Sequence, residues 1–157
     1  MNKISAYAPL LEKIFLAGLL IGLVFSLLDV VPFNITVTVV SLYGLGAAYY
    51  FSAFQRFDMP ADESQTMGFK ELLGFVIVPK VLWISCAVSV IGIAIFVSNT
   101  QSQGYKQMMV IGGLTIASAL VIVIVLAIGG VRVLKPLLPA LLRAIPLLIA
   151  DFYVYTK

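Results

Sequence analysis

Histidine is absent from the sequence, and cysteine occurs once, as Cys86 inside an apolar run. Zinc and haem sites in proteins use histidine or several cysteines as ligands, and a disulfide bond needs two cysteines. The sequence therefore predicts no metal site, no cofactor and no disulfide bond. A single thiol does not indicate the redox compartment.

Charged residues are also scarce, because they make up 11% of the chain against roughly 25% in soluble domains. Hydrophobic residues reach 62%, and the mean hydropathy is +1.11. A soluble globule could not bury so much apolar surface, whereas a helix of about 20 apolar residues satisfies its own backbone inside a bilayer. We predict an all-α integral membrane protein that forms a single membrane domain over residues 1–157.

Basic residues do not cluster: the ten lysines and arginines stand singly between apolar runs, despite a net charge of +3. Nucleic-acid binding needs a basic patch or stripe. We therefore expect no nucleic-acid partner, and we interpret the lysines and arginines as topology signals.

The first predicted hairpin covers residues 11–54 and contains two apolar runs, Leu11–Leu28 and Ile35–Phe54. Lys3 and Lys13 precede the first run, as in a secretory signal peptide, but no Ala-x-Ala pattern closes it. We expect a retained first helix.

A turn joins these two runs at Asp29, Pro32 and Asn34. Proline removes a backbone donor and disfavours helix in the residue before it, while Asp and Asn side chains bond exposed backbone groups. A carboxylate next to a membrane helix can also serve as an ion or proton site. We expect Asp29 to cap the turn, and the ion site remains the alternative.

Small residues recur at a spacing of four within the predicted helices. This spacing places them on one face, where another helix can approach closely. The predicted helix-packing residues are Gly18, Gly22, Ser26, Gly44, Ala48, Ser52, Gly113 and Ala117.

The second predicted hairpin covers residues 72–131 and follows a polar, mixed-charge loop over residues 55–71. Its first run without a charged residue, Val81–Val97, would be about 26 Å long as a helix. This is slightly shorter than the hydrocarbon core of a bilayer is thick. We therefore expect this helix to begin before Pro79 and to kink there. The next helix, Met108–Val131, contains no charge. Dipeptides repeated at offsets of 70 and 69 residues, such as Ile21-Gly22 and Ile91-Gly92, suggest a duplicated hairpin.

The remaining segment, residues 132–157, is leucine-rich but contains Arg143 and three prolines. An arginine in mid-membrane costs about 2.5–3.5 kcal/mol on insertion scales. These residues favour a Pro-kinked amphipathic or re-entrant membrane helix, and a fifth membrane helix is the alternative.

Basic residues predict the orientation. If four helices alternate, Lys106 lies on one side and the other nine lysines and arginines lie on the opposite side. By the positive-inside rule the N-terminus and the loop over residues 55–71 are then cytoplasmic, in a plasma or inner membrane. A fifth span moves only Lys157. Expected interfacial anchors are Tyr49, Tyr50, Trp83, Arg132, Lys135 and Arg143.

The predicted cores lack the ionisable groups that an intramembrane enzyme would use, and no catalytic residue is expected. Hydroxyls of Thr36, Thr38, Ser41, Thr115 and Ser118 could line a polar path, so a channel or small-molecule transporter subunit is the alternative function. We expect a non-enzymatic accessory or scaffolding subunit of a larger membrane complex, or a homo-oligomer. The expected partners are the lipid bilayer and other membrane subunits or further copies of the chain.

Overall fold

A computed structural model describes residues 3–28, 33–54, 68–98, 104–130 and 134–156, and all regular structure in these residues is helical. The elements are α1 (Lys3–Leu27), α2 (Phe33–Ser52), α3 (Phe69–Leu72), the π-helical turn η2 (Leu73–Ile77), α4 (Val78–Val97), α5 (Gly104–Ile128) and α6 (Leu134–Tyr155).

Five helices in the described residues are long and apolar enough to cross a membrane, judged by length and composition. Their candidate spans are Tyr7–Leu27, Asn34–Ser52, Leu73–Val97, Gly104–Ile128 and Leu137–Tyr155. This suggests an integral membrane protein, as the sequence predicts.

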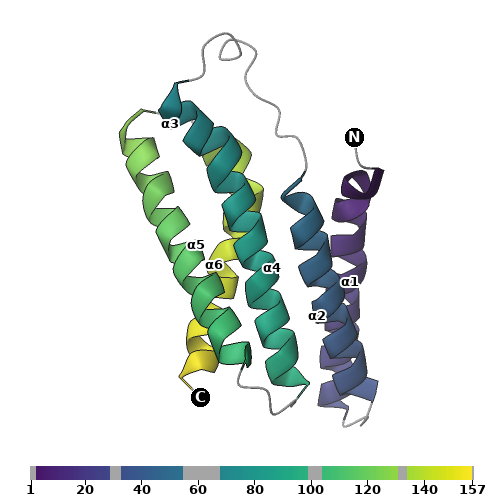
Figure 1. The fold of residues 1–157 in the computed structure, drawn as a ribbon. Helices are drawn as coiled ribbons and strands as arrows, with labels where there is room; N and C mark the ends of the chain where they lie inside the picture. The colour runs from purple at the N-terminus through teal and green to yellow at the C-terminus, as the bar shows by residue number, and fades with distance from the viewer. Residues whose placement is uncertain (1–2, 29–32, 55–67, 99–103, 131–133, 157) are drawn as a thin grey trace.

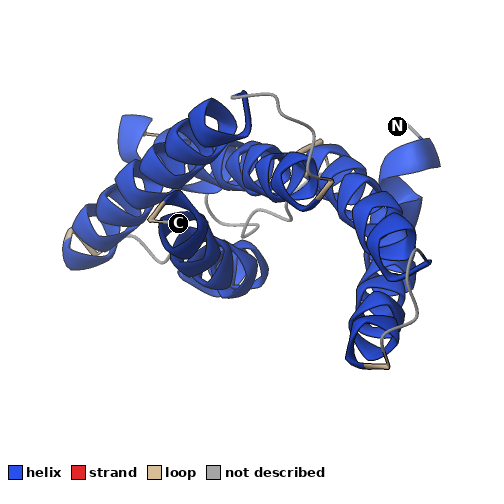
Figure 2. Ribbon diagram, turned by 90° about the horizontal axis from the view of Figure 1, so that it is seen from below, coloured by secondary structure: helices blue, strands red, loops and turns tan. Residues whose placement is uncertain are grey.

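The helices α1, α2, α4 and α5 stand in a curved row, and α6 lies against one side of it (Figures 1 and 2). Each helix in the row packs on the next, while α6 packs on both α4 and α5. Successive long helices run in opposite directions, so α1, α4 and α6 begin near the upper end of the view in Figure 1. The buried core lies mainly where α4, α5 and α6 meet, around Leu82, Ile116 and Leu137.

The helix that contains Pro79 begins before this proline, as the sequence predicts, because the candidate span starts at Leu73. Proline has no backbone N–H and its ring crowds the preceding turn. The chain accommodates this with the wide turn η2, in which the Val78 N–H donates to the Leu73 carbonyl. Lys80 is exposed.

The C-terminal segment is one helix, α6, even though Pro139 and Pro146 lie inside it. Its buried face, with Leu137, Ala140 and Ala144, packs against the core, and this tertiary packing offsets the backbone hydrogen bonds that the prolines remove. The helix α6 runs alongside α4 and α5 and is long and apolar enough to span a membrane, so it is compatible with the fifth-helix alternative. The duplicated hairpin stays a prediction.

Candidate functional site

An ion pair joins the first long helix to the last. Arg143 of α6 donates from Nε to Glu12 Oε1 and from Nη2 to Glu12 Oε2, the latter at 2.9 Å. Arg143 Nη1 also donates to the Pro139 carbonyl at 2.5 Å. Glu12 is 7% exposed, and both residues lie roughly 8 Å inside their candidate spans. Two hydrogen bonds of this kind fix the relative orientation of the two side chains and also pair their charges.

Two aromatic residues lie next to the pair on one side. The guanidinium carbon of Arg143 lies 5.3 Å from the centroid of the Trp83 ring, within the range of a cation–π contact. The Trp83 and Tyr49 rings are 5.5 Å apart at an angle of 51°. We call Glu12, Tyr49, Trp83 and Arg143 the ion-pair cluster. It draws on α1, α2, α4 and α6.

This geometry differs from the expected interfacial anchors. Tyr49 and Trp83 are 5% and 6% exposed, so their rings face the inside of the helical bundle. Arg143 faces Glu12, and its side chain is 30% exposed. Tyr50 is exposed and contacts Phe54 edge-on, as an anchor would. Arg132 and the Lys135 side chain lie outside the described residues.

Glu12 is not among the residues that the sequence patterns predict to be functional. Its signal was present, since Glu12 and Arg143 are opposite charges that each interrupt an apolar run. An ionisable residue at membrane depth usually has a partner.

A second polar pair lies where α4, α5 and α6 meet. Ser89 of α4 is fully buried and Asp151 of α6 is 4% exposed. The two approach adjacent glycines of α5: a Cβ on Gly112 would overlap Ser89 Oγ, and a Cβ on Gly113 would lie 3.5 Å from Asp151 Oδ2. Ser89 Oγ and both Asp151 carboxylate oxygens have no hydrogen-bond partner among the described residues.

Asp151 lines a surface groove between α5 and α6, with a cavity volume of about 350 Å³. We call this the α5/α6 groove. Its lining residues are Met109, Val110, Gly113, Leu114, Ala117, Leu148, Asp151, Phe152 and Tyr155. The predicted packing residues Gly113 and Ala117 therefore face this groove, and its walls are apolar apart from Asp151 and the Tyr155 hydroxyl.

The small residues of α1 pack against α2. A Cβ on Gly18 would overlap Ser41, and one on Gly22 would overlap Thr38. Gly44 of α2 faces the Phe15 ring instead of a small residue. Two further predicted packing residues of α2, Ala48 and Ser52, are buried, and Ser52 Oγ donates to the Ala48 carbonyl at 2.9 Å.

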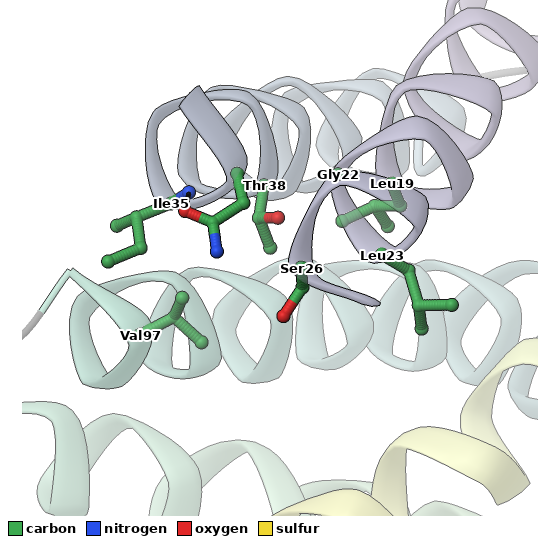
Figure 3. A pocket seen from close by; sticks show the side chains of 8 residues that line it. Leu19, Gly22, Leu23, Ser26, Ile35, Thr38 and Val97 are labelled. Atoms are coloured by element: carbon green, nitrogen blue, oxygen red, sulfur yellow. Dashed lines mark hydrogen bonds between the residues drawn. The ribbon is translucent and has the colours of Figure 1, made fainter. Parts of the chain in front are cut away.

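Ser26, the third member of the α1 stripe, lines a second pocket of about 340 Å³ (Figure 3). Side chains from α1, α2 and α4 surround it: Leu19, Gly22, Leu23, Ser26, Asn34, Ile35, Thr38 and Val97. Asn34 Oδ1 accepts a hydrogen bond from the Ile35 N–H at 2.6 Å, a local bond at the start of α2. Asp29 and Pro32 lie outside the described residues.

The hydroxyls that could line a polar path do not share one surface. Thr38 and Ser41 face α1. Thr115 and Ser118 donate to the Ile111 and Leu114 carbonyls of their own helix, and these two bonds are exposed. Among the described residues, Thr38 and Ser41 therefore do not face the same surface as Thr115 and Ser118.

Comparisons with protein families, with curated proteins and with solved structures found no match to this chain.

Proposed function

We propose that this chain is a non-enzymatic, multi-pass subunit of a membrane assembly, which it forms with other membrane proteins or with further copies of itself. The α5/α6 groove carries this proposal. It is a surface groove of about 350 Å³ whose lining includes Gly113 and Ala117, one helical turn apart. Small residues at this spacing let a second helix approach and gain van der Waals contact that lipid does not supply.

The surface around the groove is apolar and exposed. Leu114 and Phe152, which flank it, are 64% and 72% exposed. Inside a bilayer, apolar exposure is expected of every lipid-facing residue and identifies no partner by itself. The distinguishing features are the hollow shape, the two small residues and the buried carboxylate.

The proposed orientation follows the lysines and arginines, with the N-terminus in the cytoplasm of a plasma or inner membrane. With five spans, the end of α6 lies on the other side. Asp151 is four residues before Tyr155, so it lies about 6 Å inside that outer end of the span.

Transport has less support than assembly. Thr38 and Ser41 of α2 face α1, and Thr115 and Ser118 of α5 bond to their own helix. A polar path would therefore need residues from several chains. An enzymatic role has no support from the sequence, which offers no histidine and no nucleophile beside a base.

Photocrosslinking in the native membrane tests the proposal. A benzoylphenylalanine residue at Leu114, in the groove, should give one discrete crosslinked product. The matched control position is Leu20 on α1, which is similarly exposed at 67% and does not line either pocket. No product at Leu114, or the same diffuse products at both positions, contradicts the proposal.

A further inference from the structure

The α5/α6 groove contains a carboxylate that the described chain does not neutralise. Asp151 is 4% exposed, lines the groove, and has no hydrogen-bond partner for either oxygen among the described residues. An isolated carboxylate in apolar surroundings is costly unless it is paired with a positive charge or protonated.

Among the residues that the structure describes, the basic side chains nearest to Asp151 are engaged or distant. Arg143 precedes Asp151 by eight residues, about 12 Å along α6, and two of its nitrogens bind Glu12. On α5, Lys106 lies seven residues before Gly113, about 10 Å along the helix. The Lys106 ammonium is 6.0 Å from the Tyr105 ring centroid. Ser89 is close to the same junction, but its hydroxyl is neutral.

A bound metal ion fits the groove poorly. Calcium takes six to eight oxygen ligands, whereas the groove offers the two carboxylate oxygens, one tyrosine hydroxyl and otherwise apolar walls. A side chain that brings its own charge and an apolar stem fits better. Lysine and arginine have this build, with a long hydrocarbon stem and a charged end.

We propose that the α5/α6 groove receives a membrane helix of a different protein, which carries a lysine or arginine that pairs with Asp151. This inference rests on the proposed function. The partner helix packs against the exposed Leu114 and Phe152 and over Ala117, and its basic side chain enters the cavity. Its charge lies level with Asp151, about 6 Å from the end of the span.

A second copy of this chain is a poorer occupant. Copies that share one orientation in the membrane place equivalent residues at equal depth. Gly113 lies at the depth of Asp151, and the nearest lysine of the described part of α5, Lys106, is about 10 Å away along the helix axis.

Purified full-length protein in phosphatidylcholine vesicles tests this inference with synthetic helices. One probe is a Leu/Ala helix of about 20 residues with a single lysine about one turn from its end. The control helix has leucine at that position. Energy transfer between a donor on the protein and an acceptor on the helix reports binding. We expect the lysine helix to bind about tenfold more tightly or better, as for other desolvated charge pairs.

Asp151→Asn should reduce that preference to a factor of about two or less, because an amide bonds lysine without charge. Asp151→Lys should instead prefer a helix with aspartate at the same position, and this charge swap excludes loss of folding as the cause. Equal binding of the lysine and leucine helices by the wild-type protein overturns the inference. If crosslinking at Leu114 then persists in cells, the proposed function stands and only the charge pairing is wrong.

Discussion

Arg143 binds both carboxylate oxygens of Glu12 across a sequence separation of 131 residues. The pair ties α1, which packs mainly on α2, to α6 on the side of the helical row. Removing two charges from water is costly, and only good geometry with additional bonds offsets that cost. Here the second carboxylate oxygen, the Pro139 carbonyl and the Trp83 ring supply those additional contacts.

Breaking this pair should destabilise the fold more than removing it whole. We expect Arg143→Met or Glu12→Met alone to cost about 3 kcal/mol, since each leaves one buried charge without its partner. The double variant should cost clearly less than the sum of the two. Thermal unfolding in mild detergent, followed by circular dichroism, measures the stability of the wild-type protein and the three variants as a double-mutant cycle. Additive effects would show that the two side chains do not interact.

Trp83, the single tryptophan of the chain, reports whether the ion-pair cluster is closed. Because Trp83 is 6% exposed, brominated phosphatidylcholine should quench its fluorescence weakly. The matched control combines Trp83→Phe with Tyr50→Trp, which moves the indole to a position that is 47% exposed. That variant should be quenched strongly. Equal quenching of the two proteins would place Trp83 against lipid, as an interfacial anchor.

Hydropathy and helix length predict much of this fold, because they depend on composition within each segment. The early start of the helix before Pro79 also follows from the length that a span requires. Contacts between distant segments do not follow from the composition of either segment. Glu12 and Arg143 each interrupt an apolar run, but their separation of 131 residues hides that they meet. In the sequence, Asp151 is likewise one charge near the end of a leucine-rich segment, and nothing there indicates that it lines a groove.

The prolines of α6 show why the tail was harder to predict. Pro139 and Pro146 argue locally against a helix, and the structure keeps one through burial of Leu137, Ala140 and Ala144. That burial depends on α4 and α5, which local propensity does not include. The groove beside Gly113 and Ala117 depends on the same packing.

A side chain at position 112 should weaken the contact between α4 and α5 and destabilise the fold. A Cβ there would overlap Ser89 Oγ and would lie 3.1 Å from the Ser89 backbone nitrogen. We expect Gly112→Ala to cost about 1–3 kcal/mol through overpacking. Gly104→Ala is the matched control on the same helix, since no atom lies within 4 Å of its added Cβ. It should change stability by less than about 0.5 kcal/mol. Thermal unfolding of both variants checks this, and equal effects would argue against the close approach.

If all five candidate helices cross the membrane, the two ends of the chain lie on opposite sides of it. Epitope tags at the N-terminus and C-terminus, probed in spheroplasts or intact cells before and after permeabilisation, measure this directly. We expect the N-terminal tag to be protected and the C-terminal tag to be accessible. Protection of both tags would mean that α6 does not cross.

Assembly through the α5/α6 groove is the central claim, and native mass spectrometry of the protein in mild detergent tests it most directly. The wild-type protein should appear with a stoichiometric second membrane subunit or a second copy of itself. Ala117→Leu, which fills the groove, should release the 17.0 kDa monomer. Ala17→Leu on the exposed face of α1 should leave the assembly intact. A wild-type protein that is monodisperse, monomeric and free of any partner would contradict the account.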